Sequence, residues 1–308
     1  KCRANVKTYD QRLSQAYNFC QQLAKNHYEN FPVASILLPK RLRLPISVIY
    51  AFSRTADDFA DEGDASQTER LHQLDIYSHA LLQISEESYQ GSDPIFIALA
   101  DVIHQHDLPV HLFHDLLSAF KQDVVKNRYD NFDEVLDYCC RSANPVGRLL
   151  LHLNGKPRPE QLEQSDNVCT ALQLINFYQD IVQDYTEQDR IYLPHDELVA
   201  SGLTETDLVK PDTQKIAPLI RSLYQRTEQL MAKGYPLGSV LSGRMGWEVR
   251  AMTLGGIQTL ALLNKQRDEE LLTRPRLGRM MMVRVLLGSL VKRFYLSTAK
   301  KLLGKIPV

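Results

Sequence analysis

The chain has 308 residues, of which 44% are hydrophobic and 24% are charged, a composition typical of a soluble globular protein. Its 14 glycines and 14 prolines are few for this length, which disfavours an all-β fold with its many turns. The formal net charge of −1 indicates no nucleic-acid partner, and five cysteines without a CxxC pair favour free thiols in a reducing compartment.

Helical periodicity dominates the chain, because apolar residues recur at three- and four-residue spacing and strand-like alternation is absent over any useful length. The spacing predicts helices over 13–27, 46–59, 68–83, 95–106, 110–125, 132–153, 166–185, 213–233, 240–264 and 280–303. Breakers such as "LP" at 44 and "NGKPRP" at 154 separate these segments. We therefore expect a single all-α domain of about ten helices over residues 1–308.

Charge is distributed unevenly, because residues 271–308 hold nine basic side chains and no acidic one. A basic amphipathic tail can lie on an anionic membrane surface, or it can pack its apolar side on the domain and expose only its charges. No signal peptide and no membrane-spanning apolar run is found. We expect a cytoplasmic protein, with peripheral contact to the inner membrane as an open alternative.

A first acidic stretch, "RTADDFADEGD" at 54–64, directly follows an apolar segment that reads as a buried helix. Asp57 and Asp61 are four residues apart and share a helix face, whereas Asp58 and Glu62 point about a hundred degrees away. Like charges at this spacing repel one another, although a solvated helix end would tolerate the repulsion. Taken alone, the stretch favours a charged helix end over a site.

A second stretch, "LQLINFYQDIVQDYTEQDRIYLP" at 172–194, places Asn176, Asp180 and Asp184 on one helix face among apolar neighbours. Two such helices facing each other would gather four or five oxygen ligands around one cavity. Mg²⁺ prefers oxygen ligands and relieves the repulsion between carboxylates. Bound Mg²⁺ in turn binds diphosphate and stabilises the charge that develops as diphosphate departs. The two stretches together predict a magnesium–diphosphate site.

A di-iron bundle is the competing metal hypothesis, and it needs two ExxH motifs on inward faces. The chain has one such motif, from Glu69 to His72, in a strongly polar segment typical of an exposed helix face. No glycine-rich phosphate loop, GxSxG, HExxH or dinucleotide-binding fingerprint is present.

The two acidic stretches resemble the motifs of the squalene/phytoene synthase family of all-α trans-isoprenyl transferases, and the resemblance covers nearly the whole chain. The first family motif is DxxxD preceded by arginine, and the second is NxxxDxxxD followed by "DRIYLP". The matching residues are Arg54, Asp57, Asp61, Asn176, Asp180, Asp184, Arg190 and Tyr192. The resemblance implies an isoprenoid synthase helical bundle around a central cavity. It also implies two or three Mg²⁺ ions held by Asp57, Asp61, Asn176, Asp180 and Asp184.

Other positions match the family outside these motifs. An early HxxxF element that helps to bind diphosphate stands as His27 to Phe31, with Asn30 where carotenoid-type members commonly have serine. The "YC…A..VG" helix of the family stands as Tyr138, Cys139, Ala143, Val146 and Gly147. The resemblance places its tyrosine near the reacting carbons.

Finer details are similar to the bacterial hydroxysqualene synthase branch of the family, which belongs to hopanoid biosynthesis. Strings such as "YCCRSANPVGRLLLHL" and "NFYQDIVQDY" support this branch. Typical squalene and phytoene synthases have arginine where Gln179 stands and a small-residue step where "SANP" stands. The branch implies that presqualene diphosphate loses diphosphate and that water captures the cation to give hydroxysqualene, without NADPH. Other squalene-pathway enzymes are then candidate partners.

This chemistry suggests roles for further residues. Arg54 and Arg250 are candidates for diphosphate binding, and Arg190 with Tyr192 for closing the pocket. A carbocation needs a dry pocket with aromatic faces, for which the candidates are Phe31, Tyr50, Phe52, Phe177 and Tyr178. Ordinary core packing is the alternative for each aromatic residue. The water needs a positioning group and a base, for which the candidates are Tyr138, Arg141, Asn144, Gln179 and the released diphosphate.

Three functions remain open from the sequence. The first is formation of hydroxysqualene from presqualene diphosphate. The second is head-to-head coupling of two prenyl diphosphates, as in presqualene diphosphate, squalene, dehydrosqualene or phytoene synthesis. The third is a non-catalytic assembly factor of the same fold. The intact carboxylates favour an enzyme, because a scaffold has no need of self-repelling acids.

Overall fold

A computed structural model describes residues 2–26, 39–209, 212–275 and 278–303, and within these ranges the chain forms helices and loops without a strand. The predicted all-α class is therefore confirmed. The chain divides into two compact units, Lys1–Val125 with Arg148–Pro157 and Lys126–Gly147 with Arg158–Val308. Among the described residues, no helix combines the length and apolarity needed to cross a membrane.

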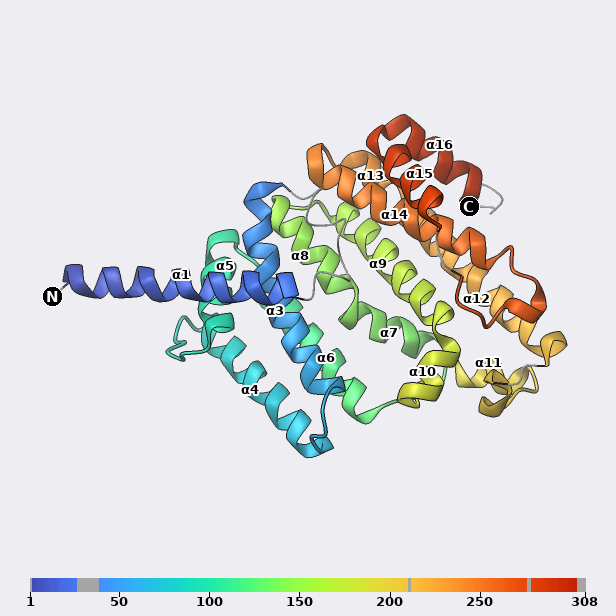
Figure 1. The fold of residues 1–308 in the computed structure, drawn as a ribbon, viewed down its shortest axis with the longest axis horizontal. Coiled ribbons are helices and arrows are strands. Elements are labelled where there is room, and N and C mark those ends of the chain that lie inside the picture. The colour runs from blue at the N-terminus through green and yellow to red at the C-terminus, as the bar shows by residue number, and fades with distance from the viewer. Residues whose placement is uncertain (1, 27–38, 210–211, 276–277, 304–308) are drawn as a thin grey trace. The chain divides into compact units, whose positions relative to one another are not determined.

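The described residues of the first unit form five long helices and part of α8 (Asn144–Asn154). The five are α1 (Cys2–Asn26), α3 (Lys40–Asp61), α4 (Gln67–Ser85), α5 (Pro94–His106) and α6 (His111–Val125). Helix α1 packs on α3 and α5, and α4 packs on α6 (Figure 1). The Phe52 ring of α3 contacts Phe96 and Phe113 with centroids 6.0 and 5.4 Å apart. Phe52 is fully buried, so it is a core residue of this unit.

Helix α3 begins earlier than the sequence predicted, because "LP" at 44 does not act as a breaker. The helix starts at Lys40 and carries Pro45 inside it. A proline inside a helix removes one backbone hydrogen bond. The helix continues through this position because Leu42, Val48 and Phe52 are all fully buried along its apolar face.

The second unit holds the remaining helices. They are α7 (Phe132–Ser142), α9 (Pro159–Gln179), α10 (Ile181–Gln188), α11 (His195–Ala200), η2 (Glu205–Leu208), α12 (Thr213–Gly234), α13 (Leu237–Val240), α14 (Gly243–Leu263), η3 (Asp268–Glu270), α15 (Arg279–Leu290) and α16 (Lys292–Leu303). Helix α8 (Asn144–Asn154) runs from this unit into the first. Helices α9 and α12 lie side by side (Figure 1), so closely that a methyl group added at Gly234 would lie 2.7 Å from the Gln164 carbonyl oxygen.

Three segments that the sequence predicted as continuous helices are each divided in two. The break between α7 and α8 falls at Ala143, where Pro145 stands in the first turn of α8 and needs no intrahelical donor. The break between α9 and α10 falls at Asp180, with φ −112° and ψ 14°. Val291 is extended, with φ −108° and ψ 122°, and separates α15 from α16.

Candidate functional site

The first acidic motif lies at the end of α3, where one arginine pairs with several of its carboxylates. Nη2 of Arg54 lies 2.6 Å from Oδ1 of Asp58, and Nη1 lies 3.4 Å from Oδ2 of Asp57. Arg54 also pairs with Glu62. Arg54 thus neutralises part of the cluster, and its role toward diphosphate stays a prediction. Asp57 is accessible and Asp61 is exposed, as a cation-binding side requires.

The turn after this motif is held by residues that sequence reasoning missed. Arg70 donates to the carbonyl oxygen of Ala60 at 2.6 Å and to that of Gly63 at 2.7 Å. Gly63 has φ +75°, which favours glycine. Ser66 and Glu69 then form a capping box at the start of α4. Glu69 and His72 are both exposed, so the exposed-face interpretation of the single ExxH motif is confirmed.

The second motif keeps its predicted register although the helix is broken in its middle. The Asp180 N–H donates to the Asn176 carbonyl oxygen at 3.1 Å, and the Asp184 N–H donates to that of Asp180 at 2.8 Å. The four-residue relation is thereby preserved across the junction of α9 and α10. Asn176 is exposed, whereas Asp180 and Asp184 are half-buried.

Burial makes the ionised forms of the two aspartates costly. It is the main cause that raises the pKa of Asp184 to about 6, and the neighbouring Asp180 adds to the effect while Arg190 and Arg274 oppose it. Burial also raises the pKa of Asp180, against the guanidinium of Arg274, whose Nε lies 3.1 Å from the Asp180 carboxylate. Gln179 donates to the Pro275 carbonyl oxygen at 3.2 Å and holds the segment that carries Arg274.

The "DRIYLP" element follows α10 and is joined to the second motif by a backbone hydrogen bond. Asp189 ends α10 in the left-handed region, with φ 51°, so the Arg190 N–H reaches the Asp184 carbonyl oxygen at 3.0 Å. The Arg190 side chain is 8% exposed, and its Nη1 lies 3.4 Å from the Tyr192 hydroxyl. A narrow cleft results, which we call the α10 cleft. Its lining residues are Phe177, Ile181, Asp184, Arg190, Ile191, Tyr192 and Leu193.

Aromatic rings stack along the wall of the α10 cleft. Phe177 and Tyr192 are parallel, with centroids 3.6 Å apart and planes 5° apart. Tyr138 of α7 lies 6.1 Å from the Phe177 ring and 5.7 Å from the Tyr192 ring. Tyr129 adds a further stacked contact with Tyr192 at 5.5 Å. The structure therefore places two predicted site residues, Phe177 and Tyr192, in the α10 cleft with Asp184, and a third, Tyr138, against their rings.

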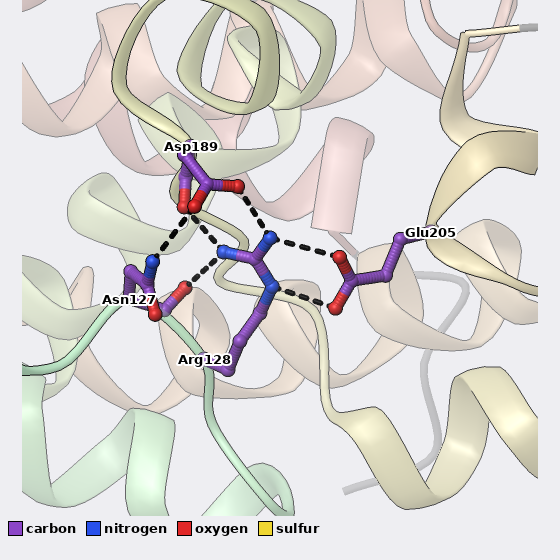
Figure 2. Close-up of polar contacts among 4 residues, drawn as sticks. All are labelled: Asn127, Arg128, Asp189 and Glu205. Atoms are coloured by element: carbon purple, nitrogen blue, oxygen red, sulfur yellow. Dashed lines mark hydrogen bonds and ion pairs between the residues drawn. The ribbon is translucent and has the colours of Figure 1, made fainter.

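A polar cluster fastens the "DRIYLP" element to the segment before α7 (Figure 2), and we call it the Arg128 clasp. Arg128 Nε and Nη2 bind the Glu205 carboxylate at 2.6 and 2.8 Å. Nη2 also binds Asp189 Oδ1 at 2.6 Å, and Asn127 Nδ2 binds Asp189 Oδ2 at 3.0 Å. Backbone bonds run alongside, such as Ile191 N–H to the Asn127 carbonyl oxygen at 2.9 Å. Arg128 thus positions the loop that carries Arg190 and Tyr192, and the sequence had not indicated it.

Other predicted site residues in the second unit are engaged in packing. Tyr178 is buried against Tyr224 of α12, with centroids 5.9 Å apart. Arg250 is also buried, and its Nε donates to the Ser289 carbonyl oxygen at 2.6 Å while Nη1 donates to that of Gly238 at 2.9 Å. These contacts correspond to core roles, and contact of either side chain with substrate stays a prediction.

The remaining candidates are placed as follows. Asn144 is buried, and its Oδ1 accepts a hydrogen bond from Thr170 at 2.9 Å. Arg141 pairs with Asp137 one turn earlier on α7 at 2.6 Å. Tyr50 is half-buried one turn before Arg54, and burial raises its pKa. The predicted diphosphate element from 27 to 31, with His27 and Phe31, lies outside the described residues.

The chemistry of the second motif fits a divalent cation. Asp180 already binds a cationic group, Arg274, and Asp184 carries a pKa that an adjacent metal ion would lower. Both side chains offer the oxygen ligands that Mg²⁺ prefers. Within the part of the chain that the structure describes, no three acidic, histidine or cysteine side chains converge as a metal-binding group. The carboxylate pair is therefore suited to share an ion with diphosphate oxygens and water.

One family model and several known proteins are similar to this chain. The model of the squalene/phytoene synthase family matches residues 24–281. A hydroxysqualene synthase of Rhodopseudomonas palustris is 37% identical over 72% of this chain and 74% of its own length. One from Sinorhizobium fredii is 35% identical over 80% of this chain and 82% of its own length. The structure of squalene synthase HpnC from Alicyclobacillus acidocaldarius, 34% identical, matches 82% of this chain and 95% of its own with a TM-score of 0.76. The expected helical isoprenoid synthase fold is thereby confirmed.

Proposed function

The chain belongs to the squalene/phytoene synthase family, and we propose that it converts presqualene diphosphate and water into hydroxysqualene and diphosphate. The observation that carries this proposal is the α10 cleft, where the half-buried Asp184 lies beside the stacked rings of Phe177 and Tyr192. The relatives from Rhodopseudomonas palustris and Sinorhizobium fredii, both named hydroxysqualene synthase, support the choice of reaction.

The residues that line the α10 cleft are polar on one side and apolar on the other, as a prenyl diphosphate is at its two ends, although the space between them is too narrow for the substrate itself. Its polar side holds Asp184 and Arg190, and its apolar side holds Phe177, Tyr192 and aliphatic residues. Aromatic faces stabilise a cation by cation–π attraction, which matters most in a site that excludes water. We therefore propose that these side chains border the site where a prenyl diphosphate ionises, with a stabilising group near each charge, once the cleft has opened.

We propose Mg²⁺ ligands in each motif, which are Asp57 and Asp61 in the first and Asn176, Asp180 and Asp184 in the second. When bound, Mg²⁺ supplies positive charge that stabilises the departing diphosphate. Arg274 neutralises Asp180 in its place when no ion is bound, and it is free to pair with diphosphate once the ion takes the carboxylate.

The proposed reaction is balanced without a reductant. The bond between the prenyl carbon and the diphosphate oxygen breaks, and the electron pair leaves with diphosphate. The cation rearranges, the oxygen of water forms the new carbon–oxygen bond, and one proton passes to a base. No atom is oxidised or reduced overall, so NADPH has no role in this step. Tyr138 borders the aromatic stack, and we propose it as the group that orients the water.

Head-to-head coupling of two prenyl diphosphates is the second candidate function. The solved relative from Alicyclobacillus acidocaldarius is described as a squalene synthase, which favours this alternative. Both reactions need diphosphate departure and a protected carbocation, so the features of the α10 cleft serve either one. The two differ in the substrate consumed and in the fate of the cation.

Product analysis distinguishes the two functions. The purified protein is incubated with Mg²⁺ and either presqualene diphosphate or farnesyl diphosphate, without NADPH, and the lipids are identified by mass spectrometry. Hydroxysqualene from presqualene diphosphate alone is the expected result. Presqualene diphosphate or a hydrocarbon formed from an allylic diphosphate, geranylgeranyl diphosphate included, would establish coupling instead. Absence of turnover with every substrate would favour a non-catalytic role.

Carboxylate variants test the assignment of the motifs. Asp57→Asn and Asp180→Asn should abolish turnover and leave the melting temperature equal or higher, because each carboxylate repels its acidic neighbours while its partly exposed arginine pair contributes little. Glu62→Gln is the matched control, since Glu62 is an exposed carboxylate that follows the end of α3, pairs with Arg54 and stands outside the DxxxD pair. If both aspartate variants unfold, the acids are structural and the assignment is wrong.

A further inference from the structure

Helix α15 turns an apolar stripe toward solvent. Met280, Val283, Leu287 and Leu290 follow one another at spacings of three, four and three residues, which places them on one helix face. All four are exposed, with 71% of Met280 and 60% of Leu287 accessible. Soluble helices normally bury such a stripe, so this orientation needs an explanation.

The opposite face of α15 is fixed to the second unit by specific contacts. Ser289 is fully buried, and its hydroxyl accepts a hydrogen bond from the Trp247 indole at 2.9 Å. The carbonyl oxygen of Ser289 accepts a hydrogen bond from Arg250 at 2.6 Å. Val285, one turn earlier on α15, packs against Leu254 of α14. Rotation of α15 to bury its apolar stripe would break these buried hydrogen bonds. The exposure of the stripe is therefore built into the packing.

The stripe continues into α16 and is bordered by basic side chains. Val291 and Phe294 are exposed, the latter to 62%. The exposed basic residues around them are Arg279, Arg284, Lys292, Arg293, Lys300 and Lys301. Among the residues that the structure describes, none of these six cations has an ion-pair partner, and residues 278–303 include no acidic side chain. We call the stripe and these cations together the α15–α16 face.

We propose that the α15–α16 face binds the surface of an anionic lipid bilayer. Large apolar side chains flanked by arginine and lysine match the boundary between headgroups and acyl chains, where the rings and chains insert and the cations meet lipid phosphates. A second copy of this chain fits less well, because equivalent faces would bring unpaired cations together. The inference goes beyond the proposed function, since it holds whichever reaction the α10 cleft performs.

Vesicle sedimentation tests this inference. The full chain is mixed with vesicles of phosphatidylcholine alone or of phosphatidylcholine and phosphatidylglycerol in equal parts. We expect binding to the anionic vesicles, weakened by salt, and at least about tenfold less binding to neutral ones. Leu287→Glu with Phe294→Glu should lose the binding about tenfold or more. Val199→Glu is the matched control, because Val199 is equally exposed on α11 and lies outside the face.

A second variant keeps the test independent of any effect on folding. Arg284→Gln with Arg293→Gln leaves the apolar stripe intact, and it should reduce binding to anionic vesicles and flatten the salt dependence. Melting curves of all variants should coincide with that of the wild type. Equal binding of wild type and both double variants, or equal binding to neutral vesicles, would overturn the proposal. Sedimentation velocity in which the wild type is a dimer that Leu287→Glu separates would assign the face to a second copy instead.

Discussion

The Arg128 clasp offers a direct test of how the candidate site is held together. Replacement of Arg128 by methionine keeps much of the side-chain volume and removes the guanidinium. The hydrogen bonds to Glu205, to the Asp189 side chain and to the Asn127 and Asp189 carbonyl oxygens would all be lost. Glu205 and Asp189 would then be left without their cation.

The expected loss of unfolding free energy in Arg128→Met follows from how exposed each of its ion pairs is. The Arg128 side chain is 26% exposed and that of Glu205 is 34% exposed, so their bidentate pair is partly shielded, whereas Asp189 at 69% is close to a surface charge. Hydrogen bonds to charged groups contribute about 1.5–3 kcal/mol, and exposed ion pairs contribute about 0.2–1 kcal/mol. We expect Arg128→Met to lower the free energy of unfolding by about 2–3 kcal/mol, with about 1–2 kcal/mol of this shared with Glu205.

A double-mutant cycle in urea measures this coupling. The free energies of unfolding of the wild type, Arg128→Met, Glu205→Gln and the double variant give the interaction energy between the two side chains. Arg267→Met is the control, because Arg267 makes a single exposed pair with Glu270 and its loss should not be resolved. A coupling below about 0.3 kcal/mol, or equal effects of Arg128→Met and Arg267→Met, would refute the structural role assigned to the clasp.

Two further variants test the second motif and its support. Asp184→Asn should raise the free energy of unfolding by about 1–2 kcal/mol at pH 8, because the folded protein holds the Asp184 pKa at about 6 against an ordinary 3.8. Between these two pKa values the folded form binds more protons than the unfolded form, so the stability of the wild type falls as pH rises through them. The stability advantage of Asp184→Asn should therefore vanish near pH 4. An advantage that urea unfolding finds equal at pH 4 and pH 8 would contradict this explanation. Gly234→Ala should cost about 1–3 kcal/mol, because its methyl group meets the α9 backbone at 2.7 Å. Gly255→Ala, with nothing within 4 Å, should instead gain about 0.5–1 kcal/mol, and equal melting temperatures for the two would show that α9 yields easily.

Much of the fold could be predicted from the sequence because amphipathic periodicity is a local property. The ten predicted segments each contain helix in their described residues, and the α7–α8 break has a local signal in Pro145. The breaks at Asp180 and Val291 have none, because no proline or glycine stands there. They arise from tertiary packing, which periodicity does not report.

In the candidate site, too, the local features could be predicted from the sequence and the long-range contacts could not. The four-residue spacing of Asn176, Asp180 and Asp184 is local, and the structure keeps it. Arg128 and Arg274 could not be predicted, because an arginine among many acquires its role only when folding brings a distant carboxylate to it. Arg250 is a candidate for diphosphate binding from the sequence, and the structure places its side chain among the contacts that hold α15. The assignment of the Mg²⁺ ligands stays a prediction.

The Arg128 clasp also bears on how the chain folds. Its bonds join residues 61 and 77 positions apart, so closing it costs loop entropy that the helices on either side do not have to overcome. Contacts of such long range usually form after local helices are in place. The loop that carries Arg190 and Tyr192 would then be assembled late and would open early, and weakening the clasp would accelerate unfolding more than it slows folding. The α10 cleft would thus be completed only when the rest of its unit is already native.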